Sequence, residues 1–437
     1  MKQLNIGLLG LGTVGRGVVE ILQERRTSLN ARAGARFNLV RVFDRSWEKK
    51  RDVLGETPAS ANVDDLLNDP EINVVIELIG GLDPAYEYVR RALQAGKSVV
   101  TANKALLARH GNELLALARG RRVTIAFEAA IAAALPVVRN MRRSFVSDEI
   151  RSFHAILNGT SNFILSRMSE DDMDYAEAAA LAQERGFAEA DPTFDVGGFD
   201  AAQKLAILGA LAFDTSIAES AVVVEGIEKI RHKDMRFVAA MGRVIRPLAV
   251  ARRNAYGRIS LRVHPALLAS EDPLATVHDE KNAVMSDCSN SGPAIITGLG
   301  AGSRPTAAAV ISDLVFISGR AEGDPQIWLS GDEPPQMQQS FAYRFYLRFE
   351  VADRPGVLAE IAELLAAEKA SIASVQQYEG AEPIDLIVVT HNVNEAALFR
   401  ALQKIRELDS VLAPPIWIRM KEDDSRAEFS EQKSNRS

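Results

Sequence analysis

A glycine-rich turn close to the start of the sequence constrains the fold more than any other feature. The apolar run Leu4–Leu9 predicts a strand, and the turn follows this strand directly and opens a predicted helix, Val14–Arg25. Glycines in such a turn let the backbone approach a pyrophosphate, whose charge is stabilised by the N-terminus of the helix. We therefore predict a dinucleotide site, with these contacts: Gly10, Gly12, Thr13, Val14 and Gly15.

The identity of the nicotinamide cofactor stays open. A second predicted strand, Phe37–Phe43, ends at Asp44. An acid in this place favours the free 2′-hydroxyl of NAD, whereas the neighbouring Arg45 favours the 2′-phosphate of NADP. Asp44 lies further from the glycines than is usual, which predicts a long loop through Ser28–Arg36.

Short apolar runs alternate with helical patterns over residues 1–130, which predicts an α/β, Rossmann-type parallel sheet. Ligands of such sheets bind at the C-terminal ends of the strands. The further predicted strands are Asn73–Ile79, Ser98–Thr101 and Arg122–Phe127, and the further helices are Pro84–Ala95 and Ala105–Arg119.

Beyond residue 130 the pattern changes to helices followed by strands. Residues 131–304 predict an α+β domain for substrate binding and oligomerisation, and a helix at 305–322 completes the first domain. Residues 329–340 are polar and proline-rich, which predicts a linker. We expect a ferredoxin-like unit over residues 341–420 and a disordered tail over 421–437. The predicted elements of the second domain are Ala176–Arg185, Ala201–Phe213, Pro247–Arg252, Ile259–Val263, Asn282–Ser286, Ala294–Thr297 and a hairpin loop from Cys288 to Gly292.

Composition excludes several functions. Lys and Arg number 51 and Asp and Glu 58, so the formal net charge of −7 predicts no nucleic-acid partner. No apolar run approaches the ~18 residues of a membrane span. The first residues lack the pattern of a signal peptide, and the single cysteine, Cys288, excludes an intrachain disulfide. We expect a cytoplasmic enzyme that acts on a small molecule.

Two lysines stand in unusual places. Lys104 follows the predicted strand Ser98–Thr101, at the ligand-binding edge of the sheet. Lys204 lies in a helix that is apolar nearly all round, four residues after Asp200. Lysine is rarely buried without a partner, and a lysine with little water around it can act as an acid or a base.

Carboxylates crowd into the segment before this helix: Glu189, Asp191, Asp195 and Asp200. Such a cluster can bind a metal, hold a substrate ammonium or simply be solvated. Two carboxylates with a lysine and no histidine suit a zwitterionic substrate better than a divalent metal.

Taken together, these segments resemble the homoserine dehydrogenase family from about residue 4 to 320. The matching motifs are GLLGLGTVGRGVV, ELIGG, VVTANKALLA, FEAA, ILNGTSNFIL, GFAEADPTFDVGGFDAAQKLAIL, VEGI, RVHP and GAGSRPTAAAVISDL. The resemblance implies NAD(P)-dependent reduction of L-aspartate 4-semialdehyde to L-homoserine, on the route to threonine and methionine. Hydride would pass from the cofactor to the aldehyde carbon while a lysine supplies the proton.

The resemblance also implies a role for each matching residue. Lys104 and Lys204 would be the acid–base pair, with Asp200 orienting Lys204. Glu189 and Asp195 would bind the amino end of the substrate. Asn158, Gly159 and Thr160 would line the substrate pocket, and Gly80, Thr101, Asn103, Lys104 and Gly300 would contact the cofactor. A sodium ion would be held by Glu128, Ile131, Ala133 and Leu135.

Departures from the family pattern leave two alternatives open. Alanines stand at Ala133 and Ala134 where glycines are usual, Phe187 stands where tyrosine is common, and Arg304 replaces a small or apolar residue. The first alternative is a related dehydrogenase for another amino-acid semialdehyde. The second is a catalytically weak sensor of NAD(P) and an amino acid.

The C-terminal unit resembles an ACT domain, a module that pairs with copies of itself and binds amino acids. The resemblance implies threonine or a related product as effector, although a module used only for dimer contacts remains an alternative. We expect a homodimer or homotetramer. The candidate effector contacts are Asp353, Gly356, Val357, Leu358 and Gln376.

Overall fold

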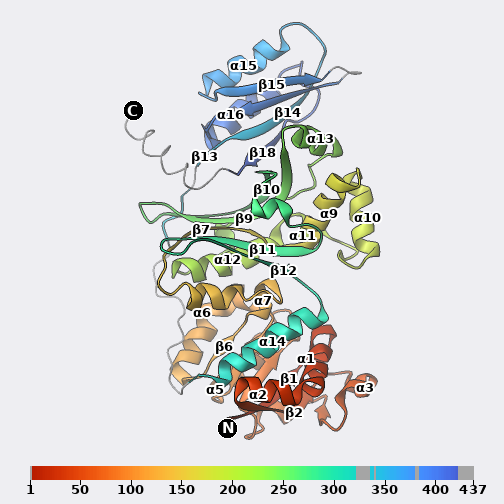
Figure 1. Ribbon diagram of the computed structural model, residues 1–437, viewed down its shortest axis with the longest axis vertical. Helices are drawn as coiled ribbons and strands as arrows, with labels where there is room; N and C mark the ends of the chain where they lie inside the picture. The colour runs from red at the N-terminus through yellow and green to blue at the C-terminus, as the bar shows by residue number, and fades with distance from the viewer. Residues whose placement is uncertain (1, 321–334, 339–340, 379–382, 422–437) are drawn as a thin grey trace.

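The computed structural model describes residues 2–320, 335–338, 341–378 and 383–421. Three units follow one another along the long axis of the molecule, with the N-terminal unit at one end and the C-terminal unit at the other (Figure 1).

The N-terminal unit contains a six-stranded sheet in the order β3-β2-β1-β4-β5-β6. All its neighbouring strands run parallel, which confirms the predicted Rossmann-type sheet. The strands are β1 (Lys2–Leu9), β2 (Ala35–Phe43), β3 (Ala59–Ser60), β4 (Val74–Glu77), β5 (Ser98–Thr101) and β6 (Ile125–Ala126). The helices are α1 (Thr13–Glu24), α2 (Arg26–Ala33), α3 (Arg51–Leu54), α4 (Asp64–Leu67), α5 (Ala85–Gln94) and α6 (Lys104–Arg121).

The prediction of a long loop through Ser28–Arg36 is wrong. The chain forms helix α2 there, and the helix ends at Gly34, whose φ of +60° suits glycine. None of the residues of α2 is buried. A helix without an apolar face carries no periodic signal, so the pattern predicted a loop.

Helix α14 (Ser303–Ser318) returns to the N-terminal unit and packs against α1. A Cβ atom at Gly17 of α1 would lie only 3.0 Å from the Ser303 hydroxyl and 3.1 Å from Ala307, so glycine permits this close approach. Arg304 also joins the helices, because its guanidinium lies 2.7 Å from the Glu24 carboxylate.

The middle unit carries helices on one side of a mostly antiparallel sheet. Helix α12 lies between this sheet and the N-terminal unit and contacts α6 (Figure 1). The predicted hairpin is confirmed, and Cys288 and Gly292 form the ends of its strands. The strands are β7 (Ile150–Ile156), β8 (Val223–Val224), β9 (Arg243–Arg253), β10 (Ile259–Ala269), β11 (Lys281–Cys288) and β12 (Gly292–Leu299). The helices are α7 (Ala129–Ala132), α8 (Val137–Arg139), α9 (Gly159–Glu170), α10 (Tyr175–Glu184), α11 (Thr193–Val196), α12 (Phe199–Phe213) and α13 (His232–Ala240).

The C-terminal unit has the predicted order of strand, helix, two strands, helix and strand. Its elements are β14 (Phe345–Val351), α15 (Val357–Ala367), β15 (Ile372–Tyr378), β16 (Ile384–Thr390), α16 (Glu395–Arg406) and β18 (Ile416–Met420). A short pair, β13 (Ala342–Tyr343) and β17 (Val393–Asn394), lies beside it. Most of the expected linker, 329–340, and of the expected tail, 421–437, lies outside the described residues.

One sheet joins the middle and C-terminal units, which the sequence did not predict. Strand β18 pairs antiparallel with β14 and parallel with β10, so the sheet continues as β12-β11-β7-β9-β10-β18-β14-β16-β15. No helix in the described ranges is long and apolar enough to cross a membrane.

Candidate functional site

The glycine turn forms an open cradle at the C-terminal end of β1. Gly10 has a φ of +97°, and a Cβ atom there would lie 2.8 Å from the carbonyl oxygen of Leu78. A Cβ at Gly15 would clash with the Gly10 carbonyl, whereas one at Gly12 would meet nothing within 4 Å. The turn is therefore closed from behind and open in front at Gly12, where a pyrophosphate can approach the N-terminus of α1.

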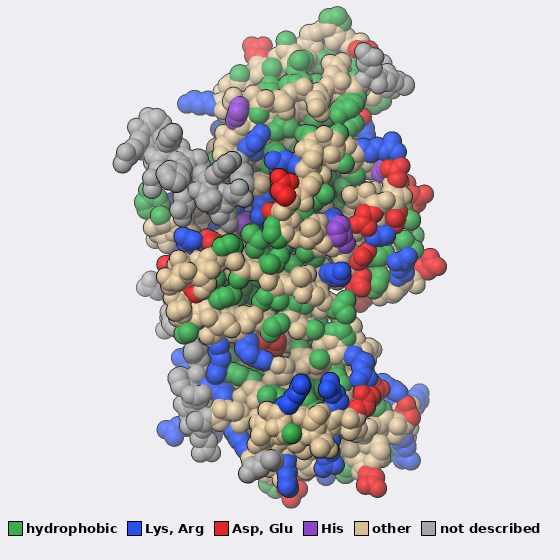
Figure 2. All heavy atoms as spheres, viewed as in Figure 1, with side chains coloured by type: hydrophobic (Ala, Val, Ile, Leu, Met, Phe, Trp, Pro, Cys, Tyr) green, Lys and Arg blue, Asp and Glu red, His purple; other side chains and the backbone are tan. Residues whose placement is uncertain are grey.

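Asp44 lies where β2 ends and supports this turn. Its carboxylate accepts the amide of Leu11 at 2.9 Å, and the Lys50 ammonium lies 2.7 Å away. Burial pushes the pKa of Asp44 upward, but the hydrogen bonds from Lys50, Leu11 and Ser46 outweigh it and bring the pKa down to about 2. Arg45 next to it is exposed. In Figure 2, Lys and Arg side chains gather over the visible face of the N-terminal unit.

Glu77 organises the neighbouring strand ends. It is fully buried at the end of β4 and accepts the amides of Ile79 and Gly80, at 2.8 and 3.1 Å. The Thr101 hydroxyl donates to Glu77 at 2.6 Å and accepts the amide of Asn103. Two of the predicted cofactor contacts, Gly80 and Thr101, are therefore held directly by one carboxylate that our sequence reasoning did not single out, and a third, Asn103, is held through Thr101.

Lys104, Asp200 and Lys204 come together where the first and middle units meet. The Asp200 carboxylate lies 3.1 Å from the Lys104 ammonium and 2.7 Å from the Lys204 ammonium. Lys104 begins α6 and Asp200 lies in the first turn of α12, so the contact between α6 and α12 places two cations on one carboxylate. The side chain of Asp200 is only 7% exposed. Burial alone would raise its pKa, but Lys204 and Lys104 hold the pKa well below its usual range.

Asn158 links this cluster to Asp195. Its side-chain amide donates to Asp195 at 2.7 Å and to Asp200 at 3.0 Å, while its carbonyl oxygen accepts the amide of Ser161 and caps α9. Asp195 is half-buried, and burial raises its pKa above the usual range. Two carboxylates therefore lie beside two lysines and a shared amide, an arrangement suited to a zwitterion with a reactive carbonyl.

Lys204 also donates to the carbonyl oxygen of Leu157 at 2.8 Å. The same oxygen accepts the Asn282 side-chain amide at 3.2 Å, and a Cβ atom at Gly300 would collide with that amide. Asn282 and the carbonyl of Leu157 therefore stand between Gly300 and Lys204. The lack of a side chain at Gly300 leaves room for the buried Asn282. Asn282 was not among the predicted site residues, because a lone asparagine in a strand gives no signal.

The remaining predicted substrate residues differ in their surroundings. A Cβ at Gly159 would lie 2.7 Å from the Glu280 carbonyl, and the Thr160 hydroxyl donates to the carbonyl of Phe187 at 2.5 Å. Glu189 is exposed, and in the part of the chain that the structure describes its carboxylate makes no hydrogen bond or ion pair to the Asp200 cluster. Asp191 is exposed too and accepts the amide of Thr193.

The segment predicted to hold sodium surrounds a buried pair of carboxylates. Both oxygens of Glu128 accept backbone amides, from Val138 and Arg139, and Asp313 accepts the Glu128 amide at 2.9 Å. Burial and the nearby Glu128 raise the pKa of Asp313 to about 8, although Arg139 lies 3.0 Å away. Ala133 has a φ of +45°, a strained conformation for a residue with a side chain.

Four of the five candidate effector residues lie on the surface of the C-terminal unit, and the fifth, Val357, does not. Gly356 precedes α15 with a φ of +99°, and nothing lies within 4 Å of a Cβ placed on it. Asp353 and Leu358 are exposed near it, whereas Val357 is buried in the core. Gln376 lies on β15, the edge strand, and one strand, β16, lies between it and β14.

Comparison with known proteins gives matches along most of the chain. A family model described as homoserine dehydrogenase matches residues 136–315, and one described as homoserine dehydrogenase, NAD binding domain, matches residues 10–128. An ACT domain model matches residues 345–410.

Individual relatives agree with the family models. A protein of Pseudomonas aeruginosa named homoserine dehydrogenase is 39% identical over 97% of this chain and 100% of its own length. A crystal structure of a homoserine dehydrogenase from Thiobacillus denitrificans is 39% identical, with a TM-score of 0.90 over 97% of this chain and 99% of that one. A hyperthermophilic archaeal homoserine dehydrogenase, solved in complex with NADPH, is 27% identical with a TM-score of 0.62 over 72% of this chain and 98% of that one.

Proposed function

The chain belongs to the homoserine dehydrogenase family of NAD(P)-dependent oxidoreductases, and we propose that Lys104, Asp200 and Lys204 carry the reduction of L-aspartate 4-semialdehyde. The observation that supports these roles above all is the meeting of both lysines on one buried carboxylate.

A nicotinamide cofactor fits the residues at the edge of the first sheet. The open face at Gly12 would admit the pyrophosphate, and Asp44 with Arg45 would lie beside the adenosine ribose. When bound, the cofactor supplies the hydride for the aldehyde carbon. Thr101 and Asn103, fixed by Glu77, would lie beside its nicotinamide ring.

The chain's own groups then handle the substrate's charges. Asp195 would bind the substrate ammonium, with the Asn158 amide holding the Asp195 carboxylate in place. Lys204, held in place by Asp200 and the carbonyl of Leu157, would donate a proton to the developing alkoxide. Lys104, which is more exposed than Lys204, would complete the acid–base pair.

A monovalent cation fits the segment from Glu128 to Leu135. Glu128 and Asp313 are both buried, and Arg139 is the cation beside them. A sodium ion held by Glu128 and the carbonyls of Ile131, Ala133 and Leu135 would order the turn that precedes α8. Its contribution would be structural.

We also assign the C-terminal unit a regulatory role, with threonine as the proposed effector and a homodimer or homotetramer as the assembly. The ACT match and the open backbone at Gly356 support this assignment, because a small amino acid can approach a backbone that has no side chain in front of it.

The decisive experiment measures oxidation of NADPH and of NADH with L-aspartate 4-semialdehyde, with and without threonine, for the wild type and Lys204→Met. Turnover that the substitution abolishes supports the assigned lysine. Turnover that Lys204→Met leaves intact would refute the catalytic assignment. Faster turnover with another amino-acid semialdehyde would favour the related dehydrogenase. The alanines at 133 and 134, where glycines are usual in the family, are the observation behind this alternative.

A further inference from the structure

The C-terminal unit places a buried arginine against the middle unit. Arg419 of β18 is 2% exposed and lies 2.5 Å from the carboxylate of Glu225, which belongs to the middle unit. It also pairs with Glu395 of α16, and Arg262 of β10 lies 2.6 Å from the other oxygen of Glu395. Two arginines and two glutamates, drawn from both units, thus form one network, in which Glu225 is half-buried and the other three side chains are buried.

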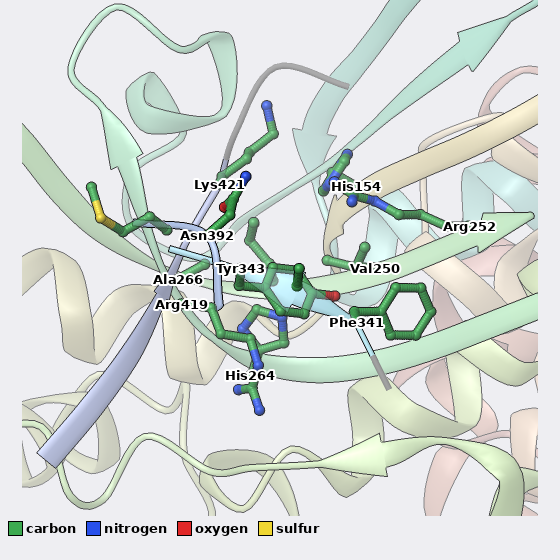
Figure 3. Close-up of a pocket in the computed structure, with 13 residues that line it drawn as sticks. His154, Val250, Arg252, His264, Ala266, Phe341, Tyr343, Asn392, Arg419 and Lys421 are labelled. Carbon is green, nitrogen blue, oxygen red and sulfur yellow. The ribbon is translucent and has the colours of Figure 1, made fainter. Parts of the chain in front are cut away.

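Figure 3 shows Arg419 beside His264 of β10, at a small cavity between the two units. The cavity measures about 60 Å³, room for about two water molecules and too little for an organic ligand. The space therefore does not explain why the arginine is there. The role of Arg419 follows instead from its partner Glu225 and from the residues that Glu225 holds in place.

Glu225 belongs to the segment that lies behind Asp195. Its amide donates to Val263 of β10 at 2.8 Å, and the amide of Ile227 donates to the carbonyl of Val196 at 3.0 Å. A Cβ at Gly198 would lie 3.0 Å from a methyl group of Val224, so the backbone there is closely packed. Residues 224–227 are therefore the support on which residues 195–198 rest.

Little empty space separates Asp195 from this support. Asn158, Asp195, Glu225 and His264 line one cavity of only about 10 Å³, which is at the limit of what a single water molecule requires. A displacement of Glu225 must therefore be taken up by the groups around it, Asp195 among them, since closely packed interiors transmit strain.

We propose that Arg419 is a positioning residue for substrate binding, which fixes Glu225 and through it holds Asp195 where it meets the substrate ammonium. The C-terminal unit thereby completes the substrate site of its own chain. This inference rests on the proposed role of Asp195, and it adds a residue of the regulatory unit to the machinery that sets substrate affinity.

Other ion pairs between the two units supply matched controls. Lys421 lies two residues beyond Arg419, is also buried and pairs with Asp272 at 2.5 Å. Asp272 precedes the short turn Pro273–Thr276 and lies outside the segment 224–227. Loss of the Lys421 bridge should therefore weaken the interface without disturbing Asp195.

The test compares Arg419→Met, Arg419→Lys, Glu225→Gln and Lys421→Met. We measure the KM for aspartate semialdehyde, the KM for NADPH, kcat and Tm. Arg419→Met and Glu225→Gln should each raise the KM for the aldehyde by about tenfold, within the range carried by packed networks, and leave the KM for NADPH unchanged. Arg419→Lys should restore part of the affinity. The double variant Arg419→Met/Glu225→Gln should be no worse than Arg419→Met alone, because both substitutions remove the same pair between Arg419 and Glu225.

Lys421→Met should lower Tm yet leave the KM for the aldehyde at the wild-type value. An equal rise in KM in Lys421→Met and Arg419→Met would overturn the proposal, as would additive effects in the double variant. If Arg419→Met does not fold, Glu225→Gln decides, because it leaves Arg419 paired with Glu395.

Asp195→Asn separates this inference from the function on which it rests. A normal KM in that variant refutes the role of Asp195, whereas a raised KM there with a normal KM in Glu225→Gln refutes only the role of Arg419.

Discussion

The Lys104 ammonium lies 3.1 Å from the Asp200 carboxylate, so the first residue of α6 meets the first turn of α12 across the boundary between two units. A cofactor bound to the sheet and a substrate bound to the middle unit would meet at this contact. The reacting groups therefore depend on how α6 and α12 pack, and not on either unit alone.

Lys204→Met should lower kcat by about 10² to 10⁴-fold, the usual worth of a positioned acid or base. The affinity for NADPH, followed by quenching of cofactor fluorescence, should stay unchanged, since Lys204 contacts Asp200 and the Leu157 carbonyl. Lys97→Met is the matched control. Lys97 is 5% exposed and donates to the carbonyl of Ile72, so its loss should lower Tm and spare kcat.

The pH dependence of substrate binding should reflect Asp195. Burial raises the pKa of this carboxyl, and only its ionised form attracts an ammonium. Hence kcat/KM for the aldehyde should fall, as the pH is lowered, at a pH above the ~3.9 of an ordinary aspartate. The hydrogen bond from the Asn158 amide lowers the pKa of Asp195. Removing this amide should therefore shift the fall in kcat/KM to still higher pH. A profile that is the same in Asn158→Ala and the wild type would speak against this origin.

Acid should also weaken the nucleotide-binding unit through Asp44. Its pKa is about 2 in the folded chain and ~3.9 when unfolded, so the ionised carboxylate stabilises the fold above pH ~4. This contribution should disappear progressively as the pH falls from about 4 toward 2. The difference in the free energy of unfolding between the wild type and Asp44→Asn, measured with urea, should shrink over that range. A constant difference would mean that the charge of Asp44 is not its source.

Arg45→Ala should raise the KM for NADPH several-fold and leave that for NADH unchanged, because only NADPH has a 2′-phosphate for a guanidinium to bind. Lys49→Ala, a neighbouring exposed cation, is the control for a general loss of positive charge. Equal effects on both cofactors would exclude Arg45 from cofactor discrimination.

Ala133→Gly should raise the free energy of unfolding by about 1 kcal/mol, because glycine relieves the strain of a φ of +45°. Ala134→Gly is the neighbouring control. Its φ is not in the left-handed region, so glycine should lower stability by about 0.5 to 1 kcal/mol. Denaturation with urea measures both, and the same sign of change in the two variants would contradict the strain at Ala133.

Local patterns were sufficient to predict the parallel sheet, and they singled out the two lysines that the fold brings onto one carboxylate. Buried strands followed by glycines or polar residues mark the ligand edge of such a sheet, and a lysine within an apolar helix stands out from its neighbours. Helix α2 was missed because it buries none of its residues and has no periodic signal. Glu77 was missed because the sequence does not reveal that Thr101 lies opposite its carboxylate.

Contacts between distant parts of the chain were harder to foresee. The pairing of β10 with β18 joins Ala266 to Arg419. Nothing in the sequence of either strand indicates that it pairs with the other. Such pairing follows from the packing of whole units, which local preferences do not encode. The same limit applies to Lys104 and Asp200, which were each predicted as site residues although their contact appears only in the fold.

The strand β18 also bears on how an effector signal can travel. The sheet continues from the hairpin of β11 and β12 to the outer edge at β15, and the two units are joined in it where β10 pairs with β18 over Ala266–Arg419 and Leu267–Met420. A rigid rotation of the C-terminal unit would have to break the β10–β18 pairing. An amino acid bound near Gly356 would more readily alter the twist of the shared strands, and a graded response of substrate affinity to the effector is then expected rather than an all-or-none change.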